Sequence, residues 1–439
     1  MNFFGTDGIR GTYGSTLKDS TAFLLGKSLA LLGDCPIIVI ARDTRLSGDA
    51  LFTALAQGVY SGGGNVINLG ILPTNAVGHF VRKLGGDYGV MITASHNPPE
   101  DNGLKVFDRY GVKLCQSKQL VVSRMMDSLK NERAESSKIY EPVFYDIENI
   151  YCEDMLRAVG VRLNNMSVAL DCCYGASFKV APMVFAKAGA RVTAFCNQSA
   201  GSNVNVGCGA NHPEFLQARL NEGTYQLGFA FDGDCDRLQV FEGTEAVPNN
   251  RIFYAFAKYL HEKGKLMKAT VCGTVLTNGG VEAALNRLGV KLLRSDVGDV
   301  NVFNTMVADG LNFGGEESGH YLLTDYATSS DAIVNALMVC KIFTEKGSLL
   351  AYTAECCDKP FATANIPLTK ANAKLATNQS LTATISRVSQ LYPDCRVVLR
   401  KSGTENKVRA YLEGDQAADA MSVVVATFAQ NASSRRSDD

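Results

Sequence analysis

A serine on a rigid turn is the residue with the plainest chemical use in this chain. Ser95 lies within residues 93–105, which read TASHNPPEDNGLK. The apolar run at 88–93 predicts a buried strand, so we expect Ser95 at a strand end. Pro98 and Pro99 exclude a helix and fix the loop. The turn therefore presents a hydroxyl in a defined place.

The sequence around this serine does not indicate an ordinary serine hydrolase. Ser95 has no G-x-S-x-G elbow around it and no obvious catalytic triad. The simpler alternative is a Ser-His-Asn-Pro turn whose side chains only bond backbone groups. Other clusters along the chain favour the reactive serine over that alternative.

Three carboxylates follow a second strand-like run. Asp232, Asp234 and Asp236 come directly after the apolar residues 227–231. Spaced by two on a near-extended segment, they can converge on one point, and a divalent cation relieves their repulsion most simply. The oxygen set suits Mg²⁺, and we expect one ion per chain. The alternative is an acidic turn with Asx-type hydrogen bonds.

Arg237, the residue after this trio, excludes one common kind of calcium site. An EF-hand loop starting at Asp232 is excluded, because its sixth position would be Arg237 instead of glycine. Arg237 could pair with a carboxylate or with a phosphate.

A loop near the C-terminal end is typical of a phosphate site. Glycine at Gly403 lets backbone N–H groups turn inward, and the hydroxyls of Ser402 and Thr404 can donate. Arg400 and Arg409 supply charge-assisted hydrogen bonds that fit phosphate geometry. The alternative is a plain hairpin with surface charges.

Two more glycine-bracketed loops carry polar groups. One is the segment 4–11, whose Arg10 we count among the catalytic candidates. The other holds Glu316, Ser318 and His320, an acceptor, a hydroxyl and an imidazole that suit sugar hydroxyls. A buried unpaired carboxylate would be costly, so an inward Glu316 needs a polar ligand. The alternative for this loop is a capped left-handed turn with solvated glutamates.

Strand-like and helix-like runs must position these loops, and they alternate in three rounds that begin near residues 37, 167 and 270. After about residue 365 the pattern changes to that of a smaller α+β domain. The fold class we predict is α/β, with three similar α/β domains and a smaller C-terminal α+β domain. The expected domains are 1–150, 151–250, 251–365 and 366–439.

Composition limits the partners. The 43 basic and 44 acidic side chains give a formal net charge of −1, which offers no electrostatic case for nucleic acid or an anionic membrane. The first residues lack the features of a signal peptide, no run could span a bilayer, and we expect a cytoplasmic protein. The 13 cysteines are odd in number and scattered, so most should be reduced packing residues. No P-loop or G-x-G-x-x-G is present, so nucleotide binding has no support.

Together these segments resemble the α-D-phosphohexomutase superfamily, in the family's order along the chain. Within the superfamily, three features favour the members that act on glucosamine phosphates: FGTDGIRG at 4–11, the segment NVNVGCGANHPE at 203–214 and TASHNP around Ser95. The resemblance implies four domains around a central cleft and a phosphorylated Ser95. It also implies Mg²⁺ held by the aspartate trio with a phosphoserine oxygen, and a sugar held by Glu316 and Ser318.

The resemblance implies a reaction as well. Glucosamine 6-phosphate and glucosamine 1-phosphate would interconvert through a bisphosphorylated sugar, which also acts as activator, and the product would feed UDP-N-acetylglucosamine synthesis. Lys105 and His96 become candidates for proton transfer, and Lys105 would need a pKa lowered by a desolvated, cation-rich setting. The distal phosphate would be bound by the loop residues Arg400, Ser402, Thr404 and Arg409.

Several alternatives stay open. Mannose or glucose phosphates could be the substrates, and a metal-dependent sugar phosphatase or a non-enzymatic sugar-phosphate sensor would use some of the same groups. The chain has glutamate at Glu317 where family members typically carry glutamine or methionine, and Lys401 and Asn406 stand where proline is common. The phosphate donors are intact, whereas the preferred sugar is less fixed. We expect a monomer or a homodimer.

Overall fold

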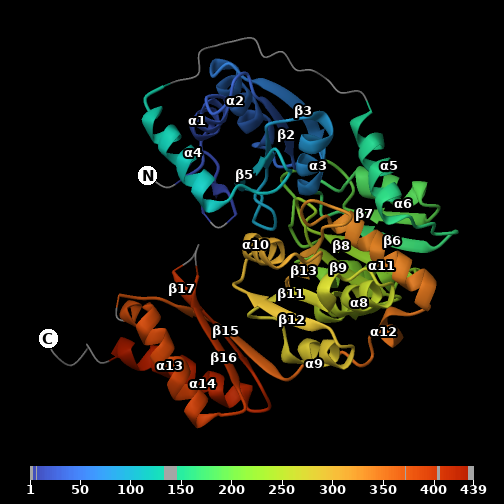
Figure 1. The fold of residues 1–439 in the computed structure, drawn as a ribbon, viewed down its shortest axis with the longest axis vertical. Helices are drawn as coiled ribbons and strands as arrows, with labels where there is room; N and C mark the ends of the chain where they lie inside the picture. The colour runs from blue at the N-terminus through green and yellow to red at the C-terminus, as the bar shows by residue number, and fades with distance from the viewer. Residues whose placement is uncertain (1–2, 6, 133–145, 371, 403–405, 434–439) are drawn as a thin grey trace.

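The computed structural model describes residues 3–5, 7–132, 146–370, 372–402 and 406–433. The strands in these residues form four sheets, which follow one another along the chain (Figure 1). None of the helices in the described part combines the length and apolar character needed to cross a bilayer.

The first sheet has the order β3-β2-β4-β5-β1, with β2, β3 and β4 parallel and the other two strands antiparallel. Its strands are β1 (Ile9–Thr12), β2 (Ile37–Arg42), β3 (Asn65–Ile71), β4 (Tyr88–Ile92) and β5 (Asp101–Asp108). Its helices are α1 (Asp19–Ala30), α2 (Gly48–Ser61), α3 (Thr74–Leu84) and α4 (Gln116–Ser128).

Strand β2 is apolar from Ile37 to Ala41 because helices cover both of its faces. Ile38 and Ile40 pack in one core with residues of α1 and α2, and Val39 and Ala41 pack in another with residues of α3. This alternation follows from the two-residue period of a strand.

The second and third sheets repeat the arrangement of the first. Their orders are β7-β6-β8-β9-β10 and β12-β11-β13-β14, in which the first three strands are parallel and the rest antiparallel. The strands of the second sheet are β6 (Ser167–Asp171), β7 (Arg191–Phe195), β8 (Leu227–Phe231), β9 (Leu238–Glu242) and β10 (Glu245–Val247). Those of the third are β11 (Thr270–Thr274), β12 (Lys291–Ser295), β13 (Phe313–Gly315) and β14 (Tyr321–Leu323).

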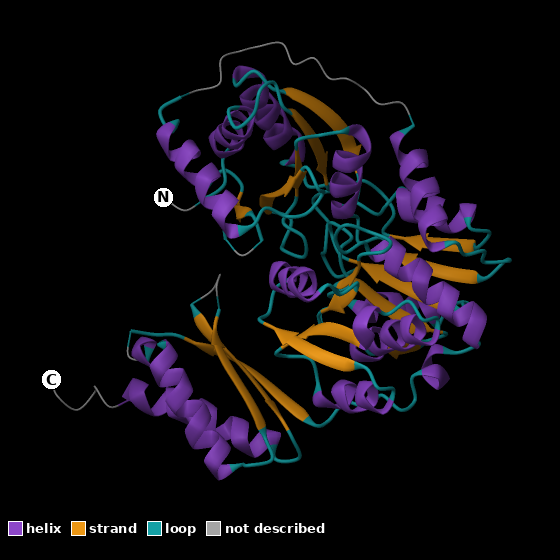
Figure 2. Ribbon diagram, viewed as in Figure 1, coloured by secondary structure: helices purple, strands orange, loops and turns teal. Residues whose placement is uncertain are grey.

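Helices flank these two sheets (Figure 2). They are α5 (Ile147–Val159), α6 (Val180–Lys187), α7 (Pro213–Leu220), α8 (Asn249–Glu262), α9 (Gly279–Arg287), α10 (Asp299–Asp309), α11 (Ala332–Lys346) and α12 (Leu349–Tyr352), with a short 3-10 turn at Met267–Ala269. All of these α-helices except α7 and α10 contribute to one core that the two sheets share. Helix α11 begins where the buried Asp331 carboxylate accepts from the backbone N–H groups of Ile333 at 3.0 Å and Val334 at 3.2 Å.

The fourth sheet is antiparallel, has the order β15-β17-β16, and carries two helices on one face (Figure 2). Its elements are β15 (Phe361–Pro367), a 3-10 turn at Ala373–Ala376, α13 (Asn378–Leu391), β16 (Arg396–Lys401), β17 (Lys407–Glu413) and α14 (Ala417–Ser433). This domain has a hydrophobic core of its own.

The predicted fold class is confirmed, with three α/β domains and a C-terminal domain built on an antiparallel sheet. The sequence does not predict β5, because Asp101-Asn102-Gly103 is typical of a turn. The expected boundary at residue 365 falls inside β15, which pairs with β17 from Phe361 onward.

One strand of each repeated sheet has the same surroundings. Strands β4, β8 and β13 each lie between a parallel and an antiparallel neighbour. Ser95, Asp232 and Glu316 lie in the loops that follow these three strands. The repeat thus places three of the predicted site loops at equivalent positions.

Candidate active site

Ser95 is held in an uncommon backbone conformation. Its φ of 53° is left-handed, and the residue is 2% exposed. Its N–H donates to the Thr93 hydroxyl at 2.8 Å. A non-glycine residue in this region persists only where the surroundings fix it, and such residues cluster at functional sites.

A buried arginine in the loop after the neighbouring strand β2 fixes the serine turn. Arg45 donates to the carbonyls of Ser95 at 2.9 Å, Asn97 at 2.8 Å and Asp101 at 2.8 Å, and also to the carbonyl of Pro98. The Asp43 carboxylate orients it by accepting from the Arg45 side chain and backbone, each at 3.0 Å. The sequence offered one signal for this pair, which is two charged residues directly after a buried parallel strand.

The second sheet also supports the turn. The side-chain amide of Asn205 donates to the carbonyls of Ser95 at 2.8 Å and Asn97 at 3.0 Å. The amide of Asn211 donates to the His96 carbonyl at 3.4 Å. The segment 203–214 therefore contacts the serine loop directly.

The serine hydroxyl lies against the aspartate trio. Ser95 Oγ donates to Asp232 Oδ2 at 2.9 Å, although the two residues come from different sheets. The other oxygen of Asp232 accepts from the backbone N–H groups of Asp236 at 3.0 Å and Arg237 at 3.1 Å. The structure thus brings together the serine and the carboxylates that the sequence singled out separately.

The trio is a possible metal site. Carboxylate oxygens of Asp232, Asp234 and Asp236 lie within 4.8 Å of one another, and all three residues are buried. At that separation each ionised pair repels by at least roughly 3.5 kcal/mol with an effective dielectric constant of about 20. Burial, together with Asp236 and Asp234, raises the pKa of Asp232 to about 8. Asp234 Oδ1 and Asp236 Oδ1 are buried and have no hydrogen-bond partner among the described residues, as ligand atoms for a cation would be.

Lys105 lies among carboxylates. It is a buried residue of β5, and its Nζ donates to Asp234 Oδ2 at 2.7 Å and Asp236 Oδ2 at 3.0 Å. Burial opposes the charged form, yet Asp234, Asp236 and Asp7 raise the pKa of Lys105 well above its usual value. The expected cation-rich setting and lowered pKa are wrong for this structure, since the acidic neighbours come from a sheet that local sequence does not reveal.

Two further residues of this network, Asp7 and Lys113, were not predicted from the sequence. Asp7 lies 3.3 Å from Lys105 Nζ and also pairs with Arg10 and Lys113. Lys113 in turn pairs with Asp299 at the start of α10, which ties the first domain to the third. Asp7 could have been predicted from its place in the glycine-bracketed loop 4–11, of which only Arg10 was named as a candidate.

His96 is the nearest titratable ring to the serine. Its Nδ1 lies 3.3 Å from Ser95 Oγ. Burial, with Arg237 and Arg10 nearby, lowers the pKa of His96 to about 4, so the imidazole is neutral at physiological pH. Arg10 itself donates to the Ala94 carbonyl at 3.4 Å. Both arginines therefore lie near the serine turn.

The third-sheet loop presents partly satisfied polar groups. Glu316 accepts from the Gly298 N–H at 2.8 Å, and burial raises the pKa of its carboxyl. The Ser318 hydroxyl is buried and has no hydrogen-bond partner in the part of the chain that the structure describes. His320 lies with its ring nitrogens 3.7 Å from Asp236 and from Asp299. Asp236 thus links the metal trio to this loop.

The C-terminal sheet places the two predicted phosphate-binding arginines opposite each other. Arg400 and Arg409 are direct partners on β16 and β17. Burial and the charge of Arg409 lower the pKa of Arg400, whereas the carboxylates of Glu317 and Glu316 raise it. The two arginines therefore lie near the loop that follows β13. Two like charges in such proximity favour a bound anion.

The rest of this loop is only partly described. Ser402 is buried, and its backbone N–H donates to the Lys407 carbonyl at 2.8 Å. The predicted phosphate ligands Gly403 and Thr404 lie outside the described residues.

A second pair on the same strands anchors this domain to the third. Arg396 and Glu413 are partners in the register, four residues before Arg400 and four after Arg409. Arg396 donates to Glu413 at 2.7 Å and to the Thr277 carbonyl at 2.9 Å. Glu413 also accepts from the Gly279 N–H at the start of α9, at 2.9 Å. We call Arg396 and Glu413 the anchor pair, because they set the position of the two arginines farther along the strands.

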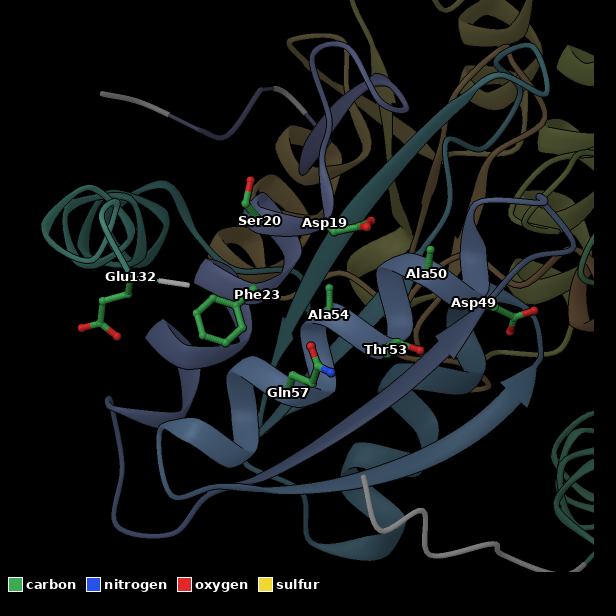
Figure 3. A pocket seen from close by; sticks show the side chains of 9 residues that line it. All are labelled: Asp19, Ser20, Phe23, Asp49, Ala50, Thr53, Ala54, Gln57 and Glu132. Atoms are coloured by element: carbon green, nitrogen blue, oxygen red, sulfur yellow. The ribbon is translucent and has the colours of Figure 1, made fainter. Parts of the chain in front are cut away.

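A surface groove of about 590 Å³ lies apart from these loops (Figure 3). It is lined by residues of α1 and α2, including Phe23, and by Glu132. Its three carboxylates already have partners: Asp19 with the Tyr13 hydroxyl, Asp49 with Arg42, and Glu132 with Lys27. None of its lining residues lies in the loops directly after β4, β8 and β13. We therefore do not assign catalysis to this groove.

Four segments of the chain match known domains in order. Residues 1–133, 149–245 and 248–359 match the phosphoglucomutase/phosphomannomutase alpha/beta/alpha domains I, II and III, and residues 364–430 match the C-terminal domain. The chain belongs to the phosphoglucomutase/phosphomannomutase family. The family expected from the sequence is thereby confirmed.

Individual relatives agree with this family. A phosphoglucosamine mutase of Thermotoga neapolitana is 38% identical over 94% of this chain and 95% of its own. A phosphoglucomutase/phosphomannomutase family protein of Burkholderia thailandensis shares the fold with a TM-score of 0.81 at 23% identity, over 100% of this chain and 98% of that one. An Aspergillus fumigatus N-acetylphosphoglucosamine mutase, solved with GlcNAc-6P and magnesium, has a TM-score of 0.63 at 15% identity, over 94% and 98%.

Arg45 should contribute far more to the free energy of unfolding than an exposed arginine of the same domain. Arg45→Met leaves Asp43 buried without its cation and several loop carbonyls without donors, so we expect a loss of about 3–5 kcal/mol in free energy of unfolding. The matched control is Arg109→Met, whose side chain is 64% exposed beside Asp87, with an expected loss below about 1 kcal/mol. Urea denaturation of the three proteins measures both, and equal losses would show that Arg45 does not fix the turn.

Proposed function

We propose that this chain interconverts glucosamine 6-phosphate and glucosamine 1-phosphate through a phosphorylated Ser95 and a bisphosphorylated sugar. The observation that carries the proposal is the 2.9 Å contact between Ser95 Oγ and Asp232 of the buried trio. It supports a serine that exchanges phosphoryl groups beside a cation. The phosphoglucosamine mutase of Thermotoga neapolitana supports the choice of sugar.

The trio fits a divalent cation by the chemistry of its donors. All are carboxylate oxygens, and two of them have no other partner. We propose that Asp232, Asp234 and Asp236, with an oxygen of phosphorylated Ser95, hold Mg²⁺. When bound, the ion supplies positive charge that stabilises the oxygens of the transferring phosphoryl group.

The protein's own residues then divide the work of two half-reactions. In the first, the bond between phosphorus and the Ser95 oxygen breaks, and the phosphoryl group bonds to the free sugar hydroxyl. That hydroxyl loses a proton, and the serine oxygen gains one. Neutral His96 suits the proton acceptor, and Lys105, which its three carboxylate neighbours keep protonated, suits the donor. The second half reverses these transfers with the other phosphate.

The sugar must be held in two orientations between these steps. Glu316 and the unpartnered Ser318 hydroxyl are suited to bind sugar hydroxyls, which both orientations present. Arg400 and Arg409, with Ser402 and Thr404, would bind whichever phosphate is not reacting. Binding of the non-reacting phosphate supports transfer by positioning the sugar.

Glu317 favours an aminated sugar. Its carboxylate accepts from the Thr274 hydroxyl at 3.1 Å and lies on the same loop as Glu316. A carboxylate forms a charge-assisted hydrogen bond with the ammonium group of glucosamine, which glucose and mannose lack. We therefore place glucosamine phosphate ahead of the other two hexose phosphates.

The direct test is turnover of glucosamine 6-phosphate with a catalytic amount of sugar bisphosphate and Mg²⁺. We expect glucosamine 1-phosphate to form, with a kcat/KM above those for glucose 6-phosphate and mannose 6-phosphate. Ser95→Ala should lose the activity, and intact mass should show one added phosphate on the wild-type chain alone. Release of free phosphate without isomer would instead identify a phosphatase.

Loss of the anchor pair should weaken substrate binding more than it slows the chemistry. Arg396→Met frees β16 and β17 from the third domain, so Arg400 and Arg409 no longer lie at a fixed distance from the sugar loop. We expect KM for glucosamine 6-phosphate to rise at least about 10-fold, with a smaller change in kcat.

Arg387→Met on α13 is the control, since that side chain is exposed. Steady-state kinetics of both variants measure the effect. An unchanged KM in Arg396→Met would show that the anchor pair does not set the position of the arginines.

A further inference from the structure

A buried cluster of thiols and one carboxylate lies at the edge of the second sheet. Asp171 is the last residue of β6, Cys196 directly follows β7, and Cys208 lies in the loop that leads to α7. The two strands are parallel neighbours, with Asp171 opposite Phe195, so their carboxyl ends meet at one edge. Potential ligand atoms of the three residues lie within 4.8 Å of one another.

We propose that Asp171, Cys196 and Cys208 bind a zinc ion at a site separate from the aspartate trio. Ligand atoms around a tetrahedral zinc lie about 3.8 Å apart, which the cluster reaches with small side-chain shifts. Thiolate sulfur selects zinc over magnesium, whereas the trio of carboxylates has the opposite preference. Cys173, the second residue after β6, is the nearest candidate for a fourth ligand.

The surroundings hold the carboxylate in place. Asp171 accepts from the backbone N–H of Gly209 at 2.6 Å and of Cys173 at 2.9 Å, and such hydrogen bonds orient metal ligands. Gly209 has a φ of +80°, and a Cβ there would lie 2.6 Å from the Cys173 sulfur. Glycine therefore lets the loop close over the cluster. Asp171 and Cys208 are buried and Cys196 is partly exposed, which leaves the ion a route to the site.

A packing role does not account for this cluster. Burying a carboxylate among thiols is costly without a cation, since the backbone N–H groups of Gly209 and Cys173 satisfy its oxygens without neutralising its charge. This cost favours a metal site over packing alone.

A metal ion at this site would affect the loop that supports the serine turn. The loop between Cys196 and Cys208 carries Asn205, whose amide donates to the Ser95 carbonyl at 2.8 Å. Cys173 Sγ donates to the carbonyl oxygen of the same amide at 2.9 Å. Zinc at the cluster would therefore stabilise the loop that supports the serine from the second sheet.

The test is zinc content after equilibration of the full chain with zinc and removal of unbound metal by gel filtration. We expect zinc to stay with the wild type at one per chain, and Cys196→Ser and Cys208→Ser to lose it. Cys340→Ser is the matched control, since Cys340 is a buried cysteine of α11 far from the cluster in sequence. Asp234→Asn should keep the zinc, because the trio is a separate site.

Cobalt substitution of the wild-type chain gives a readout that does not depend on the folding of variants. Tetrahedral thiolate coordination produces strong charge-transfer and visible absorption bands, which we expect in the wild type. Absence of retained zinc and of these bands overturns the proposal. A Cys196–Cys208 disulfide in peptide mass spectra of the unreduced protein also overturns it.

Discussion

Three carboxylates buried beside one serine hydroxyl create the constraint on which the rest of the structure depends. Their mutual repulsion needs positive charge, and the protein supplies part of it through Lys105 and Arg237. Burial and the other two carboxylates raise the pKa of Asp232 to about 8, which reflects the negative charge that the two basic groups leave unbalanced. A bound cation would answer this imbalance by adding positive charge, whereas a phosphoryl group on Ser95 would add negative charge and one more oxygen ligand, and so would increase the demand for the cation.

Topology explains how residues so far apart in the chain reach one place. Three sheets share a four-strand order, and their equivalent strands β4, β8 and β13 are followed by the loops that carry Ser95, Asp232 and Glu316. The fourth domain has its own core and depends on the anchor pair for its position. The proposed reaction, in which a sugar turns between two transfers, suits this division, because the arginines proposed to bind the non-reacting phosphate lie in a different domain from Ser95 and the aspartate trio.

Much of this was predictable from local patterns. Ser95 and the trio each follow an apolar run, so strand ends and their chemistry were visible in the sequence. Arg45 and Lys113 were missed because their partners lie 50 or more residues away in the chain, at Ser95 and at Asp299. The direction of the pKa shift of Lys105 was predicted wrongly for the same reason, since this pKa depends on carboxylates contributed by the second sheet. Cys196 and Cys208 lack a recognisable spacing, and only the adjacency of β6 and β7 brings them together with Asp171.

The central claim is that a phosphoryl group on Ser95 and a cation on the trio share one site. Phosphorus NMR of the protein phosphorylated by a sugar bisphosphate tests it most directly, with Mn²⁺ as a paramagnetic replacement for Mg²⁺. The account predicts that one equivalent of Mn²⁺ broadens the phosphoserine resonance beyond detection, and that Asp234→Asn needs far more. A phosphoserine signal that stays sharp at one equivalent of bound Mn²⁺ would contradict it.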